Sequence, residues 1–133
     1  MKFKFGYILM AGMVLTGCSG DDIRDGILCP AVVKPGIEVF VFDAETRGAI
    51  SCGSVVTIED GDFSETIVDV NRFDGSGNCD DEGPLQGAFE REGSYTVTVS
   101  KEGYEDYVDS SVEVESDVCG VITVEIGVYL TPE

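Results

Sequence analysis

Short runs of β-branched and aromatic residues recur along the chain, and clusters of Gly, Asp, Asn and Ser separate them. This alternation favours a sheet protein, because no stretch shows the apolar spacing of a helix over a useful length. In SYTVTVSK at 94–101, the alternation places Tyr95, Val97 and Val99 on one face of a strand. Seven strands are expected, at residues 37–42, 54–59, 65–70, 87–90, 94–101, 107–114 and 121–130. We therefore predict an all-β fold, a seven-stranded β-sandwich with a single core.

Turn-forming residues define the expected connections. Residues 43–48 and 60–62 follow the first two strands as turns, and Glu92-Gly93 closes a hairpin between the fourth and fifth strands. The segment 71–84, NRFDGSGNCDDEGP, is too rich in Gly and acidic residues to pair as a strand. We expect it to form an Ω-like loop held by Cys79.

The first residues have the organisation of a secretory leader. Residues 1–17 carry two lysines, an apolar stretch and then small residues, and the apolar stretch is too short to span a bilayer. Leu15-Thr16-Gly17-Cys18 resembles the bacterial lipobox, which implies cleavage before Cys18 and diacylation of its thiol. Residues 18–28 then form a lipidated, flexible spacer, and 29–133 form the sandwich domain. Because Ser19 and not Asp follows the cysteine, the resemblance favours the outer membrane in a cell with two membranes.

Five cysteines divide into Cys18 and four others, Cys29, Cys52, Cys79 and Cys119. In an exported domain four spaced cysteines usually form two disulfides, and three pairings are open. The preferred hypothesis pairs Cys29 with Cys119 and Cys52 with Cys79, so that the first bridge ties the segment before the first strand to the start of the last.

The composition excludes several classes of function. The net charge is −18, and removal of the two leader lysines leaves 6 basic residues against 26 acidic ones, a charge of −20. Nucleic acid is therefore excluded as a partner, since phosphates require basic residues. The chain has no His, and this absence excludes the activities that require an imidazole: those of zinc hydrolases and of the Ser-His-Asp and Cys-His nucleophile systems. We expect no enzyme activity and no cofactor.

The segment GSYTVTVSKEGY at 93–104 resembles the G-x-Y-x-V-x-V-x-x-x-G-Y hallmark of carboxypeptidase regulatory-like domains. Further resemblance lies in the run from Ile37 to Thr46 with its D-x-x-T turn, in VVTIEDG at 55–61, and in the closing residues 117–123 and 128–130. It covers about 100 residues. The resemblance implies a transthyretin-like Greek-key β-sandwich in which these glycines and tyrosines have scaffold roles.

Two active relatives of that fold do not fit this chain. Hydroxyisourate hydrolases rely on histidines and a C-terminal Tyr-Arg-Gly-Ser motif, whereas this chain ends in Tyr-Leu-Thr-Pro-Glu. In zinc carboxypeptidases the similar domain accompanies a separate catalytic domain, for which 133 residues leave no room. The resemblance therefore implies the non-catalytic module alone.

Acidic clusters are the remaining candidates for a binding chemistry, and calcium is the cation that suits them. The clusters are Asp60 and Asp62; Asp74, Asn78, Asp80, Asp81 and Glu82; and Glu113, Glu115 and Asp117. Residues 74–80 resemble the start of an EF-hand loop, but Cys79 occupies the glycine position and Leu85 the twelfth. A solvated acidic face is the favoured interpretation, and no metal site is predicted.

These observations predict a membrane-anchored lipoprotein of the cell envelope. Its sandwich is expected to be a non-catalytic binding or adhesion module whose partner is an envelope protein or a carbohydrate. A structural subunit of an envelope complex is the alternative, and calcium binding or a carboxylate-based hydrolase are weaker ones.

Overall fold

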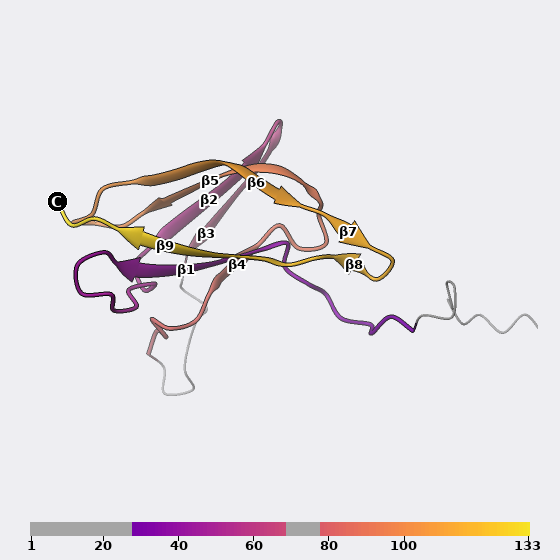
Figure 1. Ribbon diagram of the computed structural model, residues 1–133, viewed down its shortest axis with the longest axis horizontal. Coiled ribbons are helices and arrows are strands. Elements are labelled where there is room, and N and C mark those ends of the chain that lie inside the picture. Colours follow the sequence, from indigo (N-terminus) through magenta and orange to yellow (C-terminus); the bar gives the residue numbers. More distant parts are fainter. Residues whose placement is uncertain (1–27, 69–77) are drawn as a thin grey trace, which may run out of the picture.

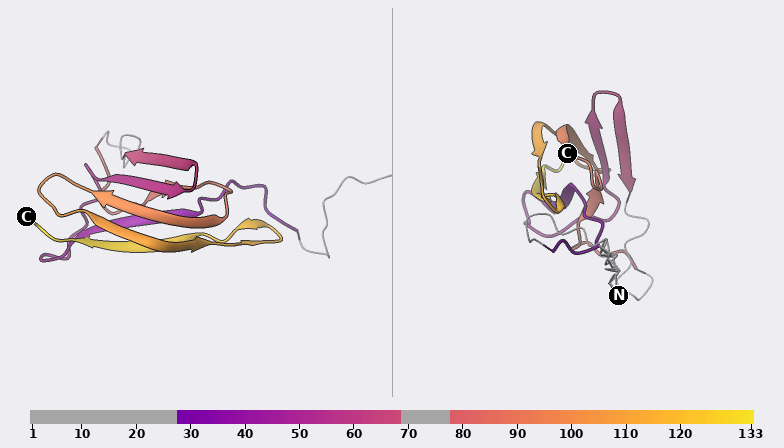
Figure 2. Two further views of the ribbon diagram at one scale, coloured as in Figure 1. Left: turned by 90° about the horizontal axis from the view of Figure 1, so that it is seen from above. Right: turned by 90° about the vertical axis from the view of Figure 1, so that its right-hand side faces the viewer.

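The computed structural model describes residues 28–68 and 78–133, which contain strands and no helix. The strands are β1 (Ile37–Asp43), β2 (Val55–Asp60), β3 (Phe63–Val68), β4 (Leu85–Gly87), β5 (Gly93–Ser100), β6 (Tyr107–Val114), β7 (Ser116–Asp117), β8 (Gly120–Val121) and β9 (Val124–Leu130). They form a three-stranded sheet, a four-stranded sheet and a two-stranded ribbon. The two larger sheets lie over one another (Figures 1 and 2). The predicted all-β fold is confirmed, and the arrangement fits a β-sandwich.

The smaller sheet joins the first and last long strands. Its order is β4-β1-β9, and β1 pairs with β9 in parallel from Ile37 opposite Val124 to Asp43 opposite Leu130. The larger sheet has the order β3-β2-β5-β6, and all its pairs are antiparallel. The parallel pair brings together segments about ninety residues apart in the chain, so the fold depends on a contact that local patterns do not encode.

The core lies between these two sheets. In β5, Tyr95, Val97 and Val99 are at most 1% exposed, as the alternation of residues 94–101 predicted. The apolar residues of the core are Ile37, Val39, Val41, Val56, Ile58, Leu85, Ala88, Tyr95, Val97, Val99, Val112, Val114, Val121, Val128 and Leu130. Members come from both larger sheets, so burial of this single cluster holds the sheets together.

The β2–β3 hairpin is tighter than predicted. Asp60 pairs with Phe63, so only Gly61 and Asp62 form the loop, and Gly61 has a φ of 56°. The third strand therefore begins at Phe63, two residues before the predicted start at Glu65. The end of the predicted strand, residues 69–70, lies outside the described residues, as do 71–77 of the expected Ω-like loop.

The predicted strand at 87–90 and its hairpin to residues 94–101 are wrong. The strand is β4, Leu85–Gly87, and it pairs with β1 in the opposite sheet. Ala88 and Glu90 then have φ values of 52°, a backbone conformation that ends the strand. The connection from 88 to 92 crosses from one sheet to the other, so Glu92-Gly93 closes no hairpin.

The predicted last strand, 121–130, is interrupted. Val121 ends the short β7–β8 hairpin, and Ile122 and Thr123 are not in a strand. At this point the Thr123 hydroxyl donates to the carbonyl of Pro35 (2.7 Å), and the Val124 N–H donates to the carbonyl of Gly36 (2.8 Å). These bonds hold the chain against the residues before β1 at the point where it leaves the hairpin and enters β9. No helix in 28–68 or 78–133 is long and apolar enough to cross a membrane.

Candidate functional site

Two disulfides join the pairs of cysteines that the sequence analysis preferred. Cys29 bonds to Cys119 and Cys52 bonds to Cys79, with Cα–Cα separations of 5.2 and 6.0 Å. Cys119 lies in the turn of the β7–β8 hairpin, so the first bridge ties the N-terminal segment to a hairpin tip and not to the start of β9. Cys18, the predicted lipidation site, lies outside the described residues.

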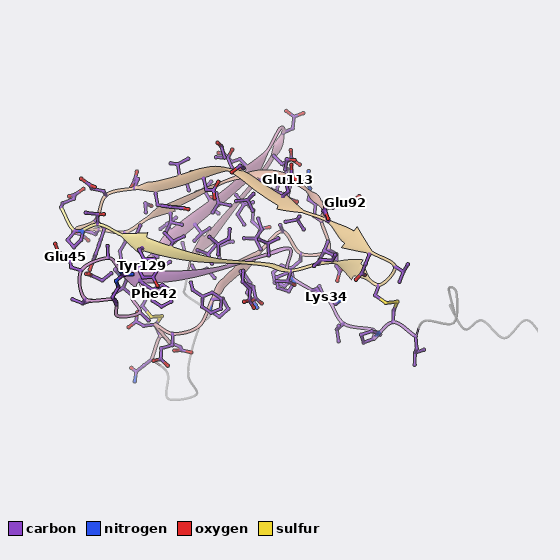
Figure 3. The ribbon with its side chains drawn as sticks, in the orientation of Figure 1. Lys34, Phe42, Glu45, Glu92, Glu113 and Tyr129 are labelled. Atoms are coloured by element: carbon purple, nitrogen blue, oxygen red, sulfur yellow. A yellow bond between two sulfur atoms is a disulfide. The ribbon has the colours of Figure 1, made fainter. Side chains whose placement is uncertain are left out.

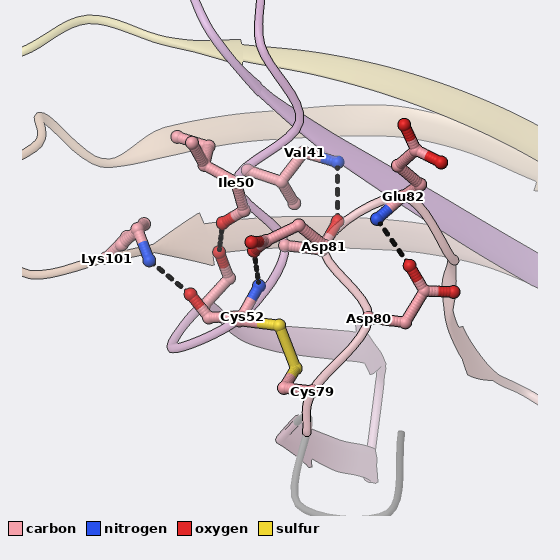
Figure 4. The surroundings of a disulfide bond; sticks show 10 residues. Val41, Ile50, Cys52, Cys79, Asp80, Asp81, Glu82 and Lys101 are labelled. Carbon is pink, nitrogen blue, oxygen red and sulfur yellow. Dashed lines mark hydrogen bonds between the residues drawn. A yellow bond between two sulfur atoms is a disulfide. The ribbon is translucent and has the colours of Figure 1, made fainter. Parts of the chain in front are cut away.

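Acidic residues next to the second disulfide bind residues 79–82 to the turn before β2 (Figure 4). The Cys52 N–H donates to Asp81 Oδ1 at 2.9 Å, and the Glu82 N–H donates to Asp80 Oδ1 at 3.0 Å. The Lys101 ammonium donates to the carbonyl of Cys52. Asp81 therefore accepts an N–H from the segment before β2, and Asp80 accepts one from its own loop.

The outer face of the three-stranded sheet carries a group of aromatic side chains, which we call the aromatic face: Phe40, Phe42 and Tyr129, with Arg47 beside them. Phe42 and Tyr129 are direct partners in the β1–β9 pair, and their rings stack with centroids 5.1 Å apart (Figure 3). The Arg47 guanidinium lies 4.8 Å from the centre of the Tyr129 ring. Tyr129 is 46% exposed and Phe42 is half-buried, so the stacked pair presents one ring and part of a second to solvent.

Polar side chains continue this outer sheet face beyond the aromatic face. Glu38 and Gln86 are partners in the β1–β4 pair, and the Gln86 amide donates to Glu38 Oε1 at 2.9 Å. Glu125 stands opposite Glu38 in β9. Because strand side chains alternate between faces, these residues point to the same side as Phe40 and Phe42. Stacked rings thus adjoin hydrogen-bonding groups, the combination found in many ligand sites.

The D-x-x-T turn after β1 is fixed by Asp43, a buried carboxylate. Asp43 Oδ1 accepts the N–H groups of Glu45 (2.7 Å) and Thr46 (2.9 Å), and Oδ2 accepts the Tyr104 hydroxyl (2.7 Å). The Thr46 N–H and then the Tyr104 hydroxyl lower the pKa of Asp43 below its ordinary value of 3.8. The same bond raises the pKa of Tyr104 above 10.0. This network fixes the turn that carries Arg47, whose guanidinium lies over the Tyr129 ring.

A second network fixes the other tyrosine of the motif. The Tyr95 hydroxyl donates to the carbonyl of Arg91 (2.8 Å), and the Arg91 guanidinium donates to Tyr95 Oη (2.9 Å) and Asp60 Oδ2 (3.0 Å). The guanidinium also lies 4.0 Å from the centre of the Phe63 ring. The bonds to Tyr95 and Asp60 raise the pKa of Arg91. Asp60, offered as a calcium ligand, is therefore an ion-pair partner.

The other acidic candidates are not brought together as a metal site. Within 28–68 and 78–133, no group of three or more Asp, Glu or Cys side chains has the placement of metal ligands. Asp117 Oδ1 accepts the Cys119 N–H at 2.8 Å in the β7–β8 turn. Glu113 and Glu115 line a shallow surface hollow with residues 92–94. Asp74, the first position of the EF-hand-like segment, lies outside the described residues.

One edge of the smaller sheet is open. In the described part of the chain no strand pairs with β9 on the side away from β1. Beyond the strand, the carbonyl of Thr131 accepts the Glu105 N–H (2.9 Å), and the Glu133 N–H donates to the carbonyl of Gly103 (3.0 Å). At the other end of β9, the Ile122 N–H donates to the carbonyl of Glu115 (2.8 Å), so segments that flank β6 hold both ends of this open edge beside β6.

Comparison with known proteins gives no assignment: no family model matches the chain, and no curated protein matches its sequence.

Proposed function

We propose that the protein is a membrane-anchored, extracytoplasmic lipoprotein whose sandwich is a non-catalytic module that binds carbohydrate through the aromatic face. The observation that carries the proposal is the exposed stack of Phe42 on Tyr129 beside Arg47. A ligand that covered this pair would bury apolar ring surface, which favours binding because aromatic rings are among the largest apolar side chains.

The leader and the cysteines support the export and the anchor. Two disulfides are expected where proteins fold under oxidising conditions, outside the cytoplasm. Cys18 follows a lipobox-like sequence, and a diacylglyceryl group joined to its sulfur by a thioether bond would hold the protein at the membrane through two acyl chains. In a cell with two membranes, Ser19 favours the outer membrane.

The anchor is tested by the variant Cys18→Ala expressed from the full-length chain. The variant would keep its apolar leader, so the readout is incorporation of radiolabelled palmitate and not partition into detergent. The native protein should be labelled and the variant should not, and equal labelling of both proteins would refute lipidation at Cys18.

The chemistry of the aromatic face favours carbohydrate over protein as the ligand. A pyranose ring has C–H groups on its two faces and hydroxyls at its rim, so it can stack on a tyrosine and hydrogen-bond to neighbouring polar groups. Glu38, Gln86 and Glu125 supply such groups on the outer face of the same sheet. Since two of these are carboxylates, the proposed ligand is a neutral or amine-bearing glycan, and an acidic one is disfavoured.

Binding is tested with the purified protein on an array of bacterial and host glycans. Tyr129→Ala should reduce binding to the glycans that the native protein retains by about tenfold or more, the cost of losing an aromatic contact. Phe89→Ala is a matched control, because Phe89 has the same 46% exposure and lies in the connection between β4 and β5. An equal effect of both substitutions would refute the aromatic face as the binding surface.

We further propose that the sandwich is a seven-stranded Greek key of the carboxypeptidase regulatory-like type, in which β7 and β8 are an added hairpin. The support is the hallmark motif and the D-x-x-T turn, whose Tyr104 and Asp43 side chains are hydrogen-bonded. An experimental structure in which the strand order departs from that fold would refute this assignment.

A second candidate function follows from the open edge of β9. An edge strand can accept a strand from another protein, which would make this chain a structural subunit of an envelope complex. Substitution of Gly127 by Pro would block such pairing because proline lacks the N–H donor. Crosslinking on intact cells should then lose a stoichiometric partner, whereas a carbohydrate-binding module would show no such partner.

A further inference from the structure

Five aliphatic side chains are exposed at the end of the sandwich where the described chain begins. They come from the segment before β1 and from the β7–β8 hairpin with the residue after it. We call them the apolar end: Leu28 (84% exposed), Val32 (57%), Val33 (72%), Val118 (51%) and Ile122 (49%). Aliphatic side chains of the kind that form the core are therefore exposed to solvent at this end, although the chain as a whole is strongly acidic.

Covalent and hydrogen bonds hold the two parts of the apolar end side by side. The Cys29–Cys119 disulfide joins them at the outer limit, and the bond from Thr123 to the carbonyl of Pro35 joins them beside the sheet. Glu90 also fixes the first segment, since its carboxylate accepts the Lys34 N–H (2.6 Å) and its own N–H donates to the Lys34 carbonyl (3.0 Å). These bonds fix the two segments of the apolar end next to each other.

The apolar end lies at one extreme of the molecule. Figure 1 shows residues 28–35 and the β7–β8 hairpin at the right, with the C-terminus at the left end of the long axis. Leu28 lies ten positions after Cys18, a distance of at most about 35 Å when the chain is fully extended. A lipid on Cys18 would therefore keep the apolar end within reach of the bilayer to which it is anchored.

We propose that the apolar end is a bilayer-contact surface, by which the sandwich rests on an uncharged or zwitterionic membrane beside its own lipid anchor. This inference rests on the proposed lipidation. The occupant is a lipid surface because the anchoring segment enters the molecule at this end. Anionic headgroups are disfavoured by the mature charge of −20, so contact depends on the aliphatic side chains.

This contact would also orient the aromatic face. Phe42 and Tyr129 lie at the ends of β1 and β9 that are remote from the apolar end, because both strands run away from it toward the C-terminus (Figures 1 and 3). With the apolar end on the membrane, the two rings lie on the part of the sheet that is remote from the lipid surface, where an external ligand can reach them.

The test uses tryptophan fluorescence, since the chain contains no Trp. The lipidated variant Val118→Trp is reconstituted in phosphatidylcholine vesicles with and without brominated acyl chains. Its emission should shift to shorter wavelength and be quenched by the brominated lipid. Val108→Trp is the control, because Val108 is 60% exposed on β6, toward the opposite end of the long axis. That variant should show neither effect.

A solvent-exposed spectrum for Val118→Trp, equal to that of Val108→Trp, would overturn the bilayer contact. Shielding from aqueous iodide without quenching by brominated lipid would also overturn it, since a second protein copy would then cover the apolar end. Intact mass on the same samples reports whether Cys18 is acylated, so failure of the anchor is distinguished from failure of the contact.

A second measurement applies whether or not the thiol is acylated. The chain without its leader, residues 18–133 with Cys18→Ala, is floated with phosphatidylcholine vesicles, and Ile122→Ser should lower its vesicle partition by about tenfold because one aliphatic side chain is lost from the contact. Val108→Ser serves as the control and should leave partition unchanged. Equal partition of the two serine variants would overturn the proposal.

Discussion

Gly87 in β4 lies close to side chains of the β2–β3 hairpin in the other sheet. The variant Gly87→Ala therefore tests how the two sheets pack. A Cβ at this position would meet the Glu65 carboxylate, and would lie 2.5 Å from Ile67 Cδ1 and 2.9 Å from Ile58 Cδ1. Carbon atoms in contact are normally about 3.5–4.0 Å apart, so either side chains or backbone must move by up to about 1 Å. Ile58 is fully buried, which leaves little room for that movement.

The cost can be built from these contacts. Displacing two isoleucines from their rotamers costs about 1 kcal/mol each, and loss of the bond from the Ala88 N–H to Glu65 costs about 1 kcal/mol more. The reduced entropy of the unfolded chain offsets about 0.5–1 kcal/mol. The expected net loss is about 2 kcal/mol, which corresponds to a melting temperature lower by roughly 8–16 °C.

Thermal unfolding followed by circular dichroism measures this loss, and Gly127→Ala is the matched control. The Cβ at 127 would lie 3.8 Å from Phe42 Cε2, an ordinary contact on the open face, so that variant should melt within a few degrees of the native protein. If Gly87→Ala melts at the same temperature as Gly127→Ala, the two sheets do not pack as described.

Two further predictions concern the second disulfide and the turn after β1. Replacing Cys52 and Cys79 together by Ala should lower the free energy of unfolding by about 3.5 kcal/mol for a loop of 27 residues, seen as a lower urea midpoint; an unchanged midpoint would contradict the bridge. Asp43→Asn should melt lower than the native protein near pH 7, and the difference should shrink below about pH 4. The pKa of Asp43 is lowered in the folded state, so its stabilisation is present above 3.8 and is lost as the pH falls through the folded value. A difference that does not begin to shrink as the pH falls below 3.8 would contradict this role.

Local patterns predicted the strands whose side chains alternate strictly. The run 94–101 became β5 with Tyr95, Val97 and Val99 buried, because one face of that strand forms the core. The strand predicted at 87–90 failed because Ala88 and Glu90 adopt positive φ, which residues of their types rarely do. The β7–β8 ribbon was not predicted, because a strand of two residues is too short to show an alternation of apolar and polar side chains.

The aromatic face could not be predicted for a different reason. Alternation places Phe42 and Tyr129 on the outer faces of their strands, but the stack exists only because β1 and β9 pair in parallel with a particular register. That register is set by pairing between distant parts of the chain, which the pattern within each strand does not encode. The partners of the acidic residues could not be predicted from the sequence either, since Asp60 binds a guanidinium and Asp81 and Asp117 bind backbone N–H groups that lie next to them only in the folded chain.

The central claim is that the protein is a lipid-anchored module, and the intact mass of the protein purified from bacterial membranes tests it most directly. We predict a chain that begins at Cys18 and is heavier than residues 18–133 by a diacylglyceryl group, with or without a third acyl chain, and by no other addition. A mass equal to that of an unmodified chain, whether it begins at Met1, at Cys18 or elsewhere, would contradict the claim.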